Sequence, residues 1–323
     1  MTLQSASCDL FCVNGHALPR LFIIAWPKTA TTSVAAHLAQ LGAGGPERGW
    51  IDGLTEVVGK EAHFFNFPER VARGLGAYAR LYSRCNPDRV FFDATPSYGL
   101  YNSDTILQMY GPERIRRSTF VAVLADPLVR TQSAFYYFHH WSSHAAWYWH
   151  SVSSDWPITK ASFANVSNAF RNVSDIDGST FASVFEMSRY IDFMPQMLDS
   201  IGSLVIIPTS HYLADSSGTP IMRALLDHER MRSGCTGPLS AWTNHVSPEA
   251  VHKMPPGSVE HISLSDEAFS PSTASLLREY FLPMIDKTYR FASTDARVVL
   301  LLSPQGSAHW LQNSTILLHS TAA

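Results

Sequence analysis

A lysine followed by small and hydroxyl-bearing residues gives this sequence its clearest candidate for an anion-binding site. Lys28 comes soon after the apolar run of residues 21–25, and a helical pattern begins at Val34. A buried strand, a tight turn and a helix N-terminus are therefore predicted in that order. The first amides of a helix have no backbone acceptor, so they can bind an anion. Together with the charge of Lys28, these donors would form a site for phosphate or sulfate. The amide and hydroxyl donors would come from Thr29, Ala30, Thr31, Thr32 and Ser33.

The spacing of this segment excludes the common nucleotide triphosphatase loop. That loop reads G-x-x-x-x-G-K-[ST], whereas no glycine lies between Leu21 and Ser33. Residues 26–32, W-P-K-T-A-T-T, instead resemble the phosphosulfate loop of sulfotransferases, which reads roughly Y-P-K-S-G-T-T. In that family the loop binds the 5′-phosphosulfate end of the donor 3′-phosphoadenylyl sulfate (PAPS). An ordinary strand, turn and helix with a threonine-rich cap remains the alternative.

A second apolar run, residues 119–124, predicts another strand that is covered on both faces. The sequence continues A-D-P-L-V-R-T-Q-S-A-F-Y-Y, which resembles the family's second donor motif, approximately R-[DN]-P-x-x-R-x-x-S-x-x-Y. Asp126 fits the N-cap of a helix, and Pro127 fits its first turn. The resemblance implies that Ser133 contacts the 3′-phosphate of the donor. A small residue suited to helix packing is the alternative for Ser133.

Two alanines depart from the family pattern. Ala30 stands where the family usually has glycine. Alanine suits a backbone with negative φ, but a positive φ would be costly for it. Ala125 replaces the family's first arginine, whose charge-assisted contact with the 3′-phosphate is one of the stronger kinds of hydrogen bond. Arg130 matches the family's second arginine, and the resemblance implies that it could compensate. The alternative for Arg130 is a solvated charge on a helix.

A third segment, residues 60–66, reads K-E-A-H-F-F-N and resembles the K-E-x-H-F-F segment of Golgi-type carbohydrate sulfotransferases, including the heparan sulfate O-sulfotransferases. The resemblance implies that Glu61 is the catalytic base and that His63 assists it. Sulfuryl transfer needs a base for the acceptor proton and donors that neutralise the leaving phosphate, and Lys28 suits the second role. On a strand, Glu61 and His63 would point to the same face. A surface glutamate and a packed histidine beside two core phenylalanines are the alternative.

Residues 89–98 end in D-A-T-P-S-Y, which resembles a family element at the acceptor cleft. Heparan-acting members often have lysine where this chain has Ala94. The resemblance implies that the loop shapes the acceptor site, with Thr95 or Tyr98 making a polar contact. A strand end followed by a turn is the alternative, because Thr-Pro-Ser is a common turn sequence.

Composition sets broad limits on the protein. At 323 residues and 46% hydrophobic content, the chain can bury a large core in one domain or at most two. No stretch approaches the roughly 18 apolar residues of a membrane span, and residues 1–19 do not show a signal-peptide pattern. The formal charge of −3 argues against a nucleic-acid partner. The four cysteines are not expected to form a disulfide scaffold in a chain of this length, and their spacing does not predict zinc.

The predicted fold is a single α/β domain, a P-loop-like three-layer sandwich with a central, mostly parallel sheet and helices on both faces. Residues 1–20 would form an N-terminal extension, residues 21–292 the sulfotransferase domain, and residues 293–323 a C-terminal extension of unknown structure. Between them we expect further elements of the domain: a loop over 151–179, a helix over 181–201, a strand over 203–208, a loop over 233–258 and a helix over 270–291. The aromatic and histidine-rich residues 135–150 are more typical of core packing than of a ligand site.

The resemblance as a whole implies a PAPS-dependent sulfotransferase that acts on a hydroxyl or amine, most often of a carbohydrate, releases 3′-phosphoadenosine 5′-phosphate (PAP) and requires no metal. Two alternatives remain open. One is a small-molecule kinase with a divergent phosphate loop, in which Asp93 and Asp126 could bind Mg²⁺; the other is a non-catalytic nucleotide-binding protein of sulfotransferase fold. The compartment would be the Golgi lumen if a signal-anchor has been trimmed, and the cytoplasm otherwise. Three N-glycosylation sequons hint weakly at the former, beginning at Asn165, Asn172 and Asn313.

Overall fold

The protein is described here by a computed structural model, which covers residues 8–47, 49–50, 56–57, 60–86, 88–141, 187–214, 219–235, 271–303 and 311. The chain divides into two compact units. The first comprises Met1–Leu124, Phe193–Met254 and Ala292–Gly306, and the second comprises Ala125–Asp192, Pro255–Phe291 and Ser307–Ala323. The predicted loop over 151–179, residues 142–150 of the aromatic stretch, and the predicted loop over 233–258 beyond Cys235 lie outside the described residues.

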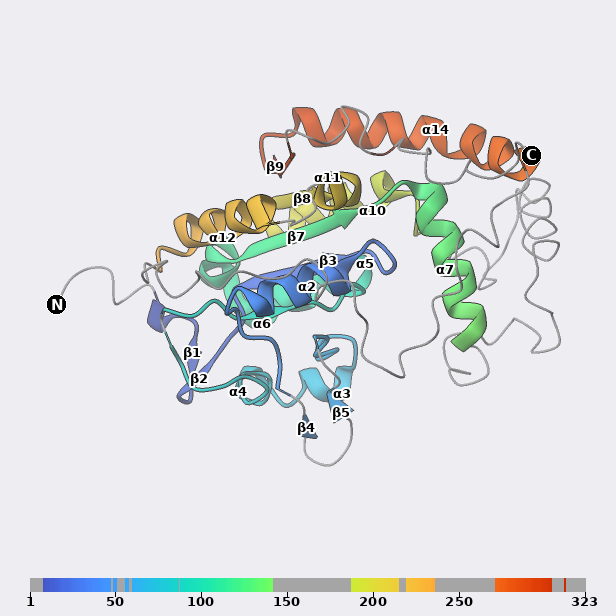
Figure 1. The fold of residues 1–323 in the computed structure, drawn as a ribbon. Coiled ribbons are helices and arrows are strands. Elements are labelled where there is room, and N and C mark those ends of the chain that lie inside the picture. The colour runs from blue at the N-terminus through green and yellow to red at the C-terminus, as the bar shows by residue number, and fades with distance from the viewer. Residues whose placement is uncertain are drawn as a thin grey trace. The chain divides into compact units, whose positions relative to one another are not determined.

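A five-stranded parallel sheet forms the centre of the first unit, in the order β6-β3-β7-β8-β9. Figure 1 shows β3, β7 and β8 side by side. All residues of these three strands are buried, because helices cover both faces of the sheet, and this explains their continuous apolar runs. The strands are β3 (Leu21–Ala25), β6 (Phe92–Asp93), β7 (Thr119–Leu124), β8 (Leu204–Pro208) and β9 (Val298–Leu300).

Alternation along the strands sends one set of side chains to each face of the sheet. Leu21 and Ile23 of β3 pack in one cluster with residues of helices α2 (Thr31–Gln40), α11 (Thr209–Ala214) and α12 (Thr219–Ser233). Phe22 points the other way, where its ring meets Tyr110 of α6 (Ser103–Arg117) at 5.3 Å between centroids. The predicted parallel sheet with helices on both faces is thus confirmed.

The remaining elements complete the two units. The expected strand over 203–208 is β8, and the expected helix over 270–291 continues to Thr294 as α14. The expected helix over 181–201 is described from Tyr190 onward as α10. Among the described residues, no helix is long and apolar enough to cross a membrane. The other elements are the hairpins β1 (Cys12–Val13) with β2 (His16–Ala17) and β4 (Gly49–Trp50) with β5 (Glu56–Val57), and the helices α3 (Pro68–Val71), α4 (Leu75–Ala79), α5 (Tyr98–Tyr101), α7 (Pro127–Trp141), α10 (Tyr190–Ile201) and α14 (Pro271–Thr294).

The four cysteines form two disulfides, so the expectation that they would not form a scaffold is wrong. Cys8 joins Cys235 and Cys12 joins Cys85, with Cα–Cα distances of 5.4 and 5.7 Å. The partners lie 227 and 73 positions apart, so sequence spacing alone could not reveal the pairs. Both bonds start from one short N-terminal segment, which is therefore tied to the end of α12 and to the chain before β6.

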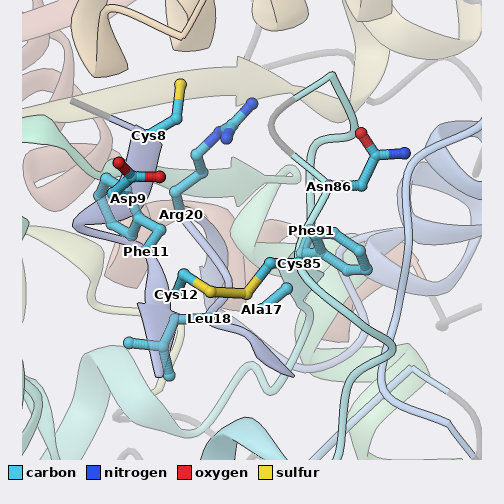
Figure 2. A pocket seen from close by; sticks show the side chains of 10 residues that line it. All are labelled: Cys8, Asp9, Phe11, Cys12, Ala17, Leu18, Arg20, Cys85, Asn86 and Phe91. Atoms are coloured by element: carbon cyan, nitrogen blue, oxygen red, sulfur yellow. A yellow bond between two sulfur atoms is a disulfide. The ribbon is translucent and has the colours of Figure 1, made fainter. Parts of the chain in front are cut away.

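These bonds border a small cavity of about 30 Å³ (Figure 2). Its lining includes the Cys12–Cys85 bond, Cys8, Asp9 and the side chain of Arg20. Arg20 is buried and its Nε donates to Glu229 Oε1 of α12 at 2.7 Å. A buried pair of opposite charges is costly to break, so this contact and the disulfides hold the same region of the first unit together.

We expect reduction to destabilise the first unit markedly. Each cross-link closes a long loop of the unfolded chain, and loss of such a bond typically costs about 2–5 kcal/mol of unfolding free energy. Urea unfolding of the native protein with and without dithiothreitol measures this difference, and a Cys12→Ser/Cys85→Ser double variant isolates one bond. Peptide mapping under non-reducing conditions should give the pairs 8–235 and 12–85. Four alkylatable thiols in protein made in an oxidising compartment would contradict the pairing.

Candidate active site

The turn between β3 and α2 is closed by its own hydroxyl and carbonyl groups. Thr29 is fully buried, and its Oγ1 donates to the carbonyl oxygen of Trp26 at 2.6 Å. Thr209 Oγ1 in turn donates to the carbonyl oxygen of Thr29 at 2.9 Å. The Thr29 hydroxyl therefore stabilises the turn. An anion in this turn would be bound by the Thr29 amide rather than by its hydroxyl group.

Ala30 adopts the left-handed conformation, with φ 70° and ψ 20°. Lys28 in the same turn has φ 71°. A residue with a Cβ pays about 1–2 kcal/mol for this conformation, whereas glycine does not. The turn thus has the positive φ for which the family's glycine is suited, and this chain adopts it with alanine.

Helix α2 begins directly after this turn. Its N-cap residue, Ala30, provides no side-chain cap, and its first turn carries no acidic residue. Thr31 is buried, Ser33 is half-buried and Thr32 is exposed. The first amides of a helix lack intrahelical acceptors, and the positive end of the helix dipole favours an anion. This helix end, with Lys28 in the preceding turn, suits the phosphosulfate end of a donor.

The turn also lies at the point in the sheet where ligands bind in folds of this kind. Strands β6 and β7 flank β3 on opposite sides, so the order of connection changes direction beside β3. In open parallel sheets, ligands bind outside the carboxyl ends of the strands at this switch point. The turn that contains Lys28 follows the carboxyl end of β3.

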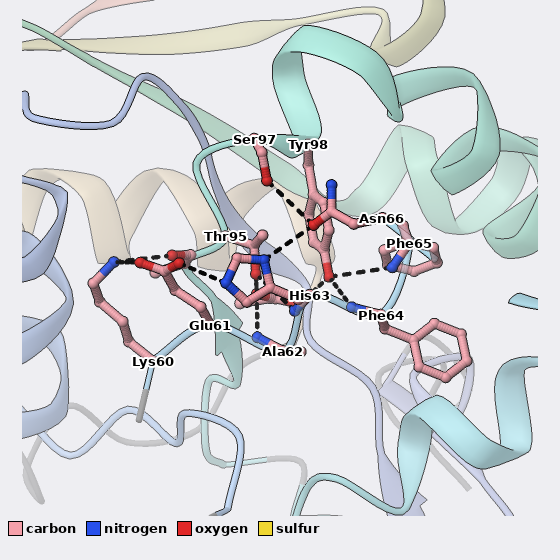
Figure 3. Close-up of polar contacts among 12 residues, drawn as sticks. Lys60, Glu61, Ala62, His63, Phe64, Phe65, Asn66, Thr95, Ser97 and Tyr98 are labelled. Atoms are coloured by element: carbon pink, nitrogen blue, oxygen red, sulfur yellow. Dashed lines mark hydrogen bonds and ion pairs between the residues drawn. The ribbon is translucent and has the colours of Figure 1, made fainter. Parts of the chain in front are cut away.

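Glu61 and His63 contact each other, although they do not lie on a strand as predicted. His63 has φ 49°, and residues 61–64 form no regular element. The left-handed backbone at His63 turns its ring back onto Glu61, with 2.9 Å between His63 Nε2 and Glu61 Oε2 (Figure 3). Lys60 Nζ contacts the other carboxylate oxygen of Glu61 and lies 3.3 Å from the carbonyl oxygen of Ala94. One carboxylate therefore lies between an ammonium and an imidazole.

Backbone contacts with the end of β6 place this cluster at the same edge of the sheet as the Lys28 turn. The amide of Ala94 donates to the carbonyl oxygen of Lys60 at 3.0 Å, and the amide of His63 donates to Thr95 Oγ1 at 3.2 Å. Strand β6 is parallel to its neighbour β3, so both carboxyl ends meet at this edge. The chain then approaches β3 closely: a Cβ at Gly99 would lie 2.3 Å from the carbonyl oxygen of Ile24, so glycine is required there.

The charges of this cluster determine the pKa values of its members. Partial burial alone would raise the pKa of Glu61, but the hydrogen bond from His63 and the charge of Lys60 outweigh it and lower that pKa to about 2. Partial burial would lower the pKa of His63, but its contact with the Glu61 carboxylate raises that pKa above 6.5. The side chains of Glu61 and His63 are 27% and 45% exposed, so both can be reached from solvent.

Two asparagines fix the protonation of the His63 ring. Asn102 Nδ2 donates to the carbonyl oxygen of Phe65 at 2.9 Å, so Asn102 Oδ1 must accept, and it does so from Asn66 Nδ2 at 2.7 Å. Asn66 Oδ1 is therefore the atom that faces His63 Nδ1 at 3.1 Å, and Nδ1 carries a proton. Nε2 faces the Glu61 carboxylate, so this geometry favours the protonated ring, in which both nitrogens donate. Roles for Asn66 and Asn102 were not expected from the sequence, and only the position of Asn66 next to the K-E-x-H-F-F segment could have indicated the first.

Thr95 and Tyr98 do not lie where an acceptor could contact their hydroxyl groups, so the sequence expectation for them is wrong. Both side chains are fully buried. Thr95 Oγ1 donates to Asp93 Oδ1 at 2.7 Å, and Tyr98 Oη donates to Asp93 Oδ2 at 3.2 Å. Asp93, one of the two carboxylates that could bind Mg²⁺ in the kinase alternative, is itself fully buried and accepts these bonds.

The second predicted donor segment, from Ala125 onward, lies in the second unit. Asp126 caps α7 as predicted, because its Oδ1 accepts from the amides of Leu128 at 2.7 Å and Val129 at 3.4 Å. Its carboxylate is thereby used within the helix, which again disfavours the kinase alternative. Among the described residues, no group of three or more histidine, cysteine or acidic side chains is placed to hold a metal.

Arg130 is fully buried in the second unit, so the alternative of a solvated helix charge is wrong. Its Nη1 donates to Ser188 Oγ at 3.0 Å, and Thr131 Oγ1 lies 2.7 Å from the same Ser188 oxygen. Ala125, at the position of the missing arginine, is buried, and its carbonyl oxygen accepts from Tyr190 Oη at 3.0 Å. Ser133 is half-buried on the same helix.

Comparison with known proteins finds likenesses in structure rather than in sequence. No protein-family model matches the sequence, and no curated protein matches it. A sulfotransferase from Alicyclobacillus acidocaldarius matches in structure with a TM-score of 0.50 and 19% identity, over 86% of this chain and 97% of that one. The chain has a sulfotransferase fold. In this sulfotransferase fold, the Lys28 turn follows a central strand of the sheet and the Glu61–His63 cluster follows the strand beside it.

We expect Ala30→Gly to stabilise the protein by about 0.5–1 kcal/mol, because the relief of the left-handed alanine exceeds the added entropy of a glycine in the unfolded chain. Urea unfolding at neutral pH measures the change. Ala36→Gly, in the middle of α2, is the matched control and should destabilise by about 1 kcal/mol. Equal destabilisation by both substitutions would contradict the left-handed conformation at Ala30.

We expect the Glu61–His63 contact to stabilise the protein most between about pH 4.5 and 6.5. The lowered pKa of Glu61 contributes stability above the ordinary value of 4.5, which is lost as the pH falls toward 2. The raised pKa of His63 contributes stability below 6.5, which is lost as the pH rises through its folded value. The unfolding free energy of the wild type minus that of His63→Gln should therefore be larger at pH 5.5 than at pH 9. In a Glu61→Gln background this pH dependence should largely disappear, and its persistence would assign it to another contact.

Proposed function

We propose that this protein is a PAPS-dependent sulfotransferase that transfers a sulfuryl group to a hydroxyl or amine of an acceptor, and that this acceptor is a carbohydrate. The observation that carries the proposal is the Glu61–His63 contact, which lies at the same edge of the sheet as the N-terminus of α2, a helix end suited to an anion, in a chain with a sulfotransferase fold. The K-E-x-H-F-F resemblance of residues 60–66 supports the carbohydrate acceptor.

The phosphosulfate end of the donor would be held by the Lys28 turn and the first amides of α2. Thr29, Ala30 and Thr31 would contribute amides; Thr32 and Ser33 could add hydroxyl groups because they are not buried. PAPS supplies an activated sulfuryl group, whose bond to the 5′-phosphate oxygen breaks as its bond to the acceptor forms. Lys28 would neutralise the charge that develops on that phosphate oxygen.

Glu61 would take the proton of the acceptor. It is ionised at neutral pH, as a base must be, but a carboxylate held by two cations is a weak base. The proposal therefore requires acceptor binding to separate Glu61 from Lys60, which raises the pKa of Glu61 when the proton must move, while His63 stays in contact with Glu61.

Arg130 and Ser133 would serve the 3′-phosphate, in place of the arginine that Ala125 replaces. The support for Arg130 is its buried guanidinium one turn into α7, held by Ser188.

The two disulfides support an oxidising compartment such as the lumen of the secretory pathway, because structural disulfides form and persist there. This favours the lumenal alternative over the cytoplasmic one.

Calorimetric titration of the purified protein with PAP is the test of the donor site. We expect micromolar binding that is lost with adenosine 5′-phosphate, because the 3′-phosphate is then missing. Glu61→Gln should bind PAP as the wild type does, yet lose at least about 10²-fold in turnover of PAPS with a carbohydrate acceptor. Lys28→Ala should weaken PAP binding and turnover together.

Three results would count against the proposal. Preference for ATP with Mg²⁺ over PAP would favour the kinase alternative. PAP binding without transfer to any of a broad acceptor panel would favour a non-catalytic binding protein. Full turnover by a folded Glu61→Gln protein would remove the base assignment and leave the rest of the site in place.

A further inference from the structure

The backbone of residues 62–65, which includes His63, is held by hydrogen bonds that lead to one buried carboxylate, that of Asp93. Asp93 has no exposed surface. Its Oδ1 accepts from Thr95 Oγ1 at 2.7 Å and from the Ala62 amide at 3.4 Å. Its Oδ2 accepts from Tyr78 Oη at 2.7 Å and from Tyr98 Oη at 3.2 Å. Four donors from three parts of the first unit therefore converge on this group.

Two of these donors, Thr95 and Tyr98, also accept hydrogen bonds from backbone amides. Each hydroxyl has a single proton and gives it to Asp93, so the lone pairs of the same oxygen can accept. Tyr98 Oη accepts from the amides of Phe64 at 2.7 Å and Phe65 at 3.4 Å, and Thr95 Oγ1 accepts from the His63 amide. The amides of residues 62–65 are thus all linked to Asp93 by hydrogen bonds, either directly or through one hydroxyl group.

The carbonyl groups of the same segment are held from the opposite direction. Arg70 Nη1 donates to the carbonyl oxygens of Ala62 and His63, both at 3.1 Å. His63 therefore keeps its left-handed backbone with its amide and its carbonyl both fixed, and its ring has little freedom to leave Glu61 through backbone movement.

We propose that Asp93 and Tyr98 are positioning residues, which hold the backbone of residues 62–65 so that His63 lies against Glu61. The inference rests on the proposed function for its catalytic meaning, but the positioning itself concerns only the geometry of His63. Neither residue contacts the reacting groups, because both side chains are fully buried.

The chain offers a matched pair of substitutions that separates positioning from general stability. Tyr78 and Tyr98 are both fully buried, and both donate to the same oxygen of Asp93. The Tyr78 oxygen accepts from Tyr82 Oη at 3.3 Å, whereas the Tyr98 oxygen accepts from the amides of Phe64 and Phe65. Tyr78→Phe and Tyr98→Phe thus remove the same kind of bond from Asp93, but only the second releases the backbone next to His63.

The first readout is kinetic. Tyr98→Phe should lower kcat about tenfold or more with PAP affinity unchanged, because a small displacement of reacting groups is costly. Tyr78→Phe should keep kcat within about twofold of the wild type. Equal losses in the two variants would overturn the proposal and assign the network to stability alone. If Tyr98→Phe does not fold, Thr95→Ser and Thr95→Val replace the pair: the serine keeps the hydroxyl that receives the His63 amide and should restore what valine loses.

The second readout does not depend on activity. Titration of the His63 ring by NMR in the full protein reports its contact with Glu61 directly. Tyr98→Phe should move the His63 pKa down toward 6.5 and alter the Nε2 resonance, and Tyr78→Phe should do so much less. If the wild type transfers no sulfuryl group, the proposed function fails while this titration still decides the positioning role. Identical His63 titrations in the two variants would refute it.

Discussion

The parallel pairing of β6 with β3 is the constraint on which the candidate site depends. The pairing is short, with Leu21 opposite Phe92 and Phe22 opposite Asp93. The parallel pairing runs the two strands in the same direction, so that the turn after β3 and the chain after β6 leave toward the same edge of the sheet. It also sets Asp93 at the last position of its strand, from which its carboxylate reaches the backbone of residues 62–65. A slip of one residue would send Asp93 to the other face and separate these contacts.

The site combines two solutions to the cost of polar groups in the interior. Asp93 is ringed by hydroxyl and amide donors, and its burial raises the pKa of that carboxyl despite them. Glu61 is partly exposed and is compensated by the charges of its neighbours, which lower its pKa. The first arrangement suits a group that holds structure, because its partners are numerous and neutral. The second suits a group that takes part in chemistry, because its partners can be displaced from the solvent side.

The sequence predicted the parts of the structure that follow from local patterns. Apolar runs identified β3, β7 and β8, and the Asp126-Pro127 pair identified the start of α7. It did not predict the geometry of the Glu61–His63 contact, because the left-handed backbone at His63 depends on Arg70, Thr95 and other distant residues. The disulfides were missed for the same reason: pairing over long separations is a property of the folded chain. Whether Ala30 would adopt a positive φ could be posed from the sequence, but only the surrounding turn could decide it.

The bond between Cys8 and Cys235 turns most of the chain into a covalent ring. Four strands of the parallel sheet lie within it, β3, β6, β7 and β8, whereas β9 and α14 follow Cys235 and lie outside. A single protease cut anywhere between residues 8 and 235 would therefore leave one molecule, held by the disulfide even if the fold were lost. A cut after Cys235 would release a fragment that keeps only its non-covalent contacts, among them the pairing of β9 with β8. The ring gives these four strands a protection from fragmentation that the edge strand β9 does not share.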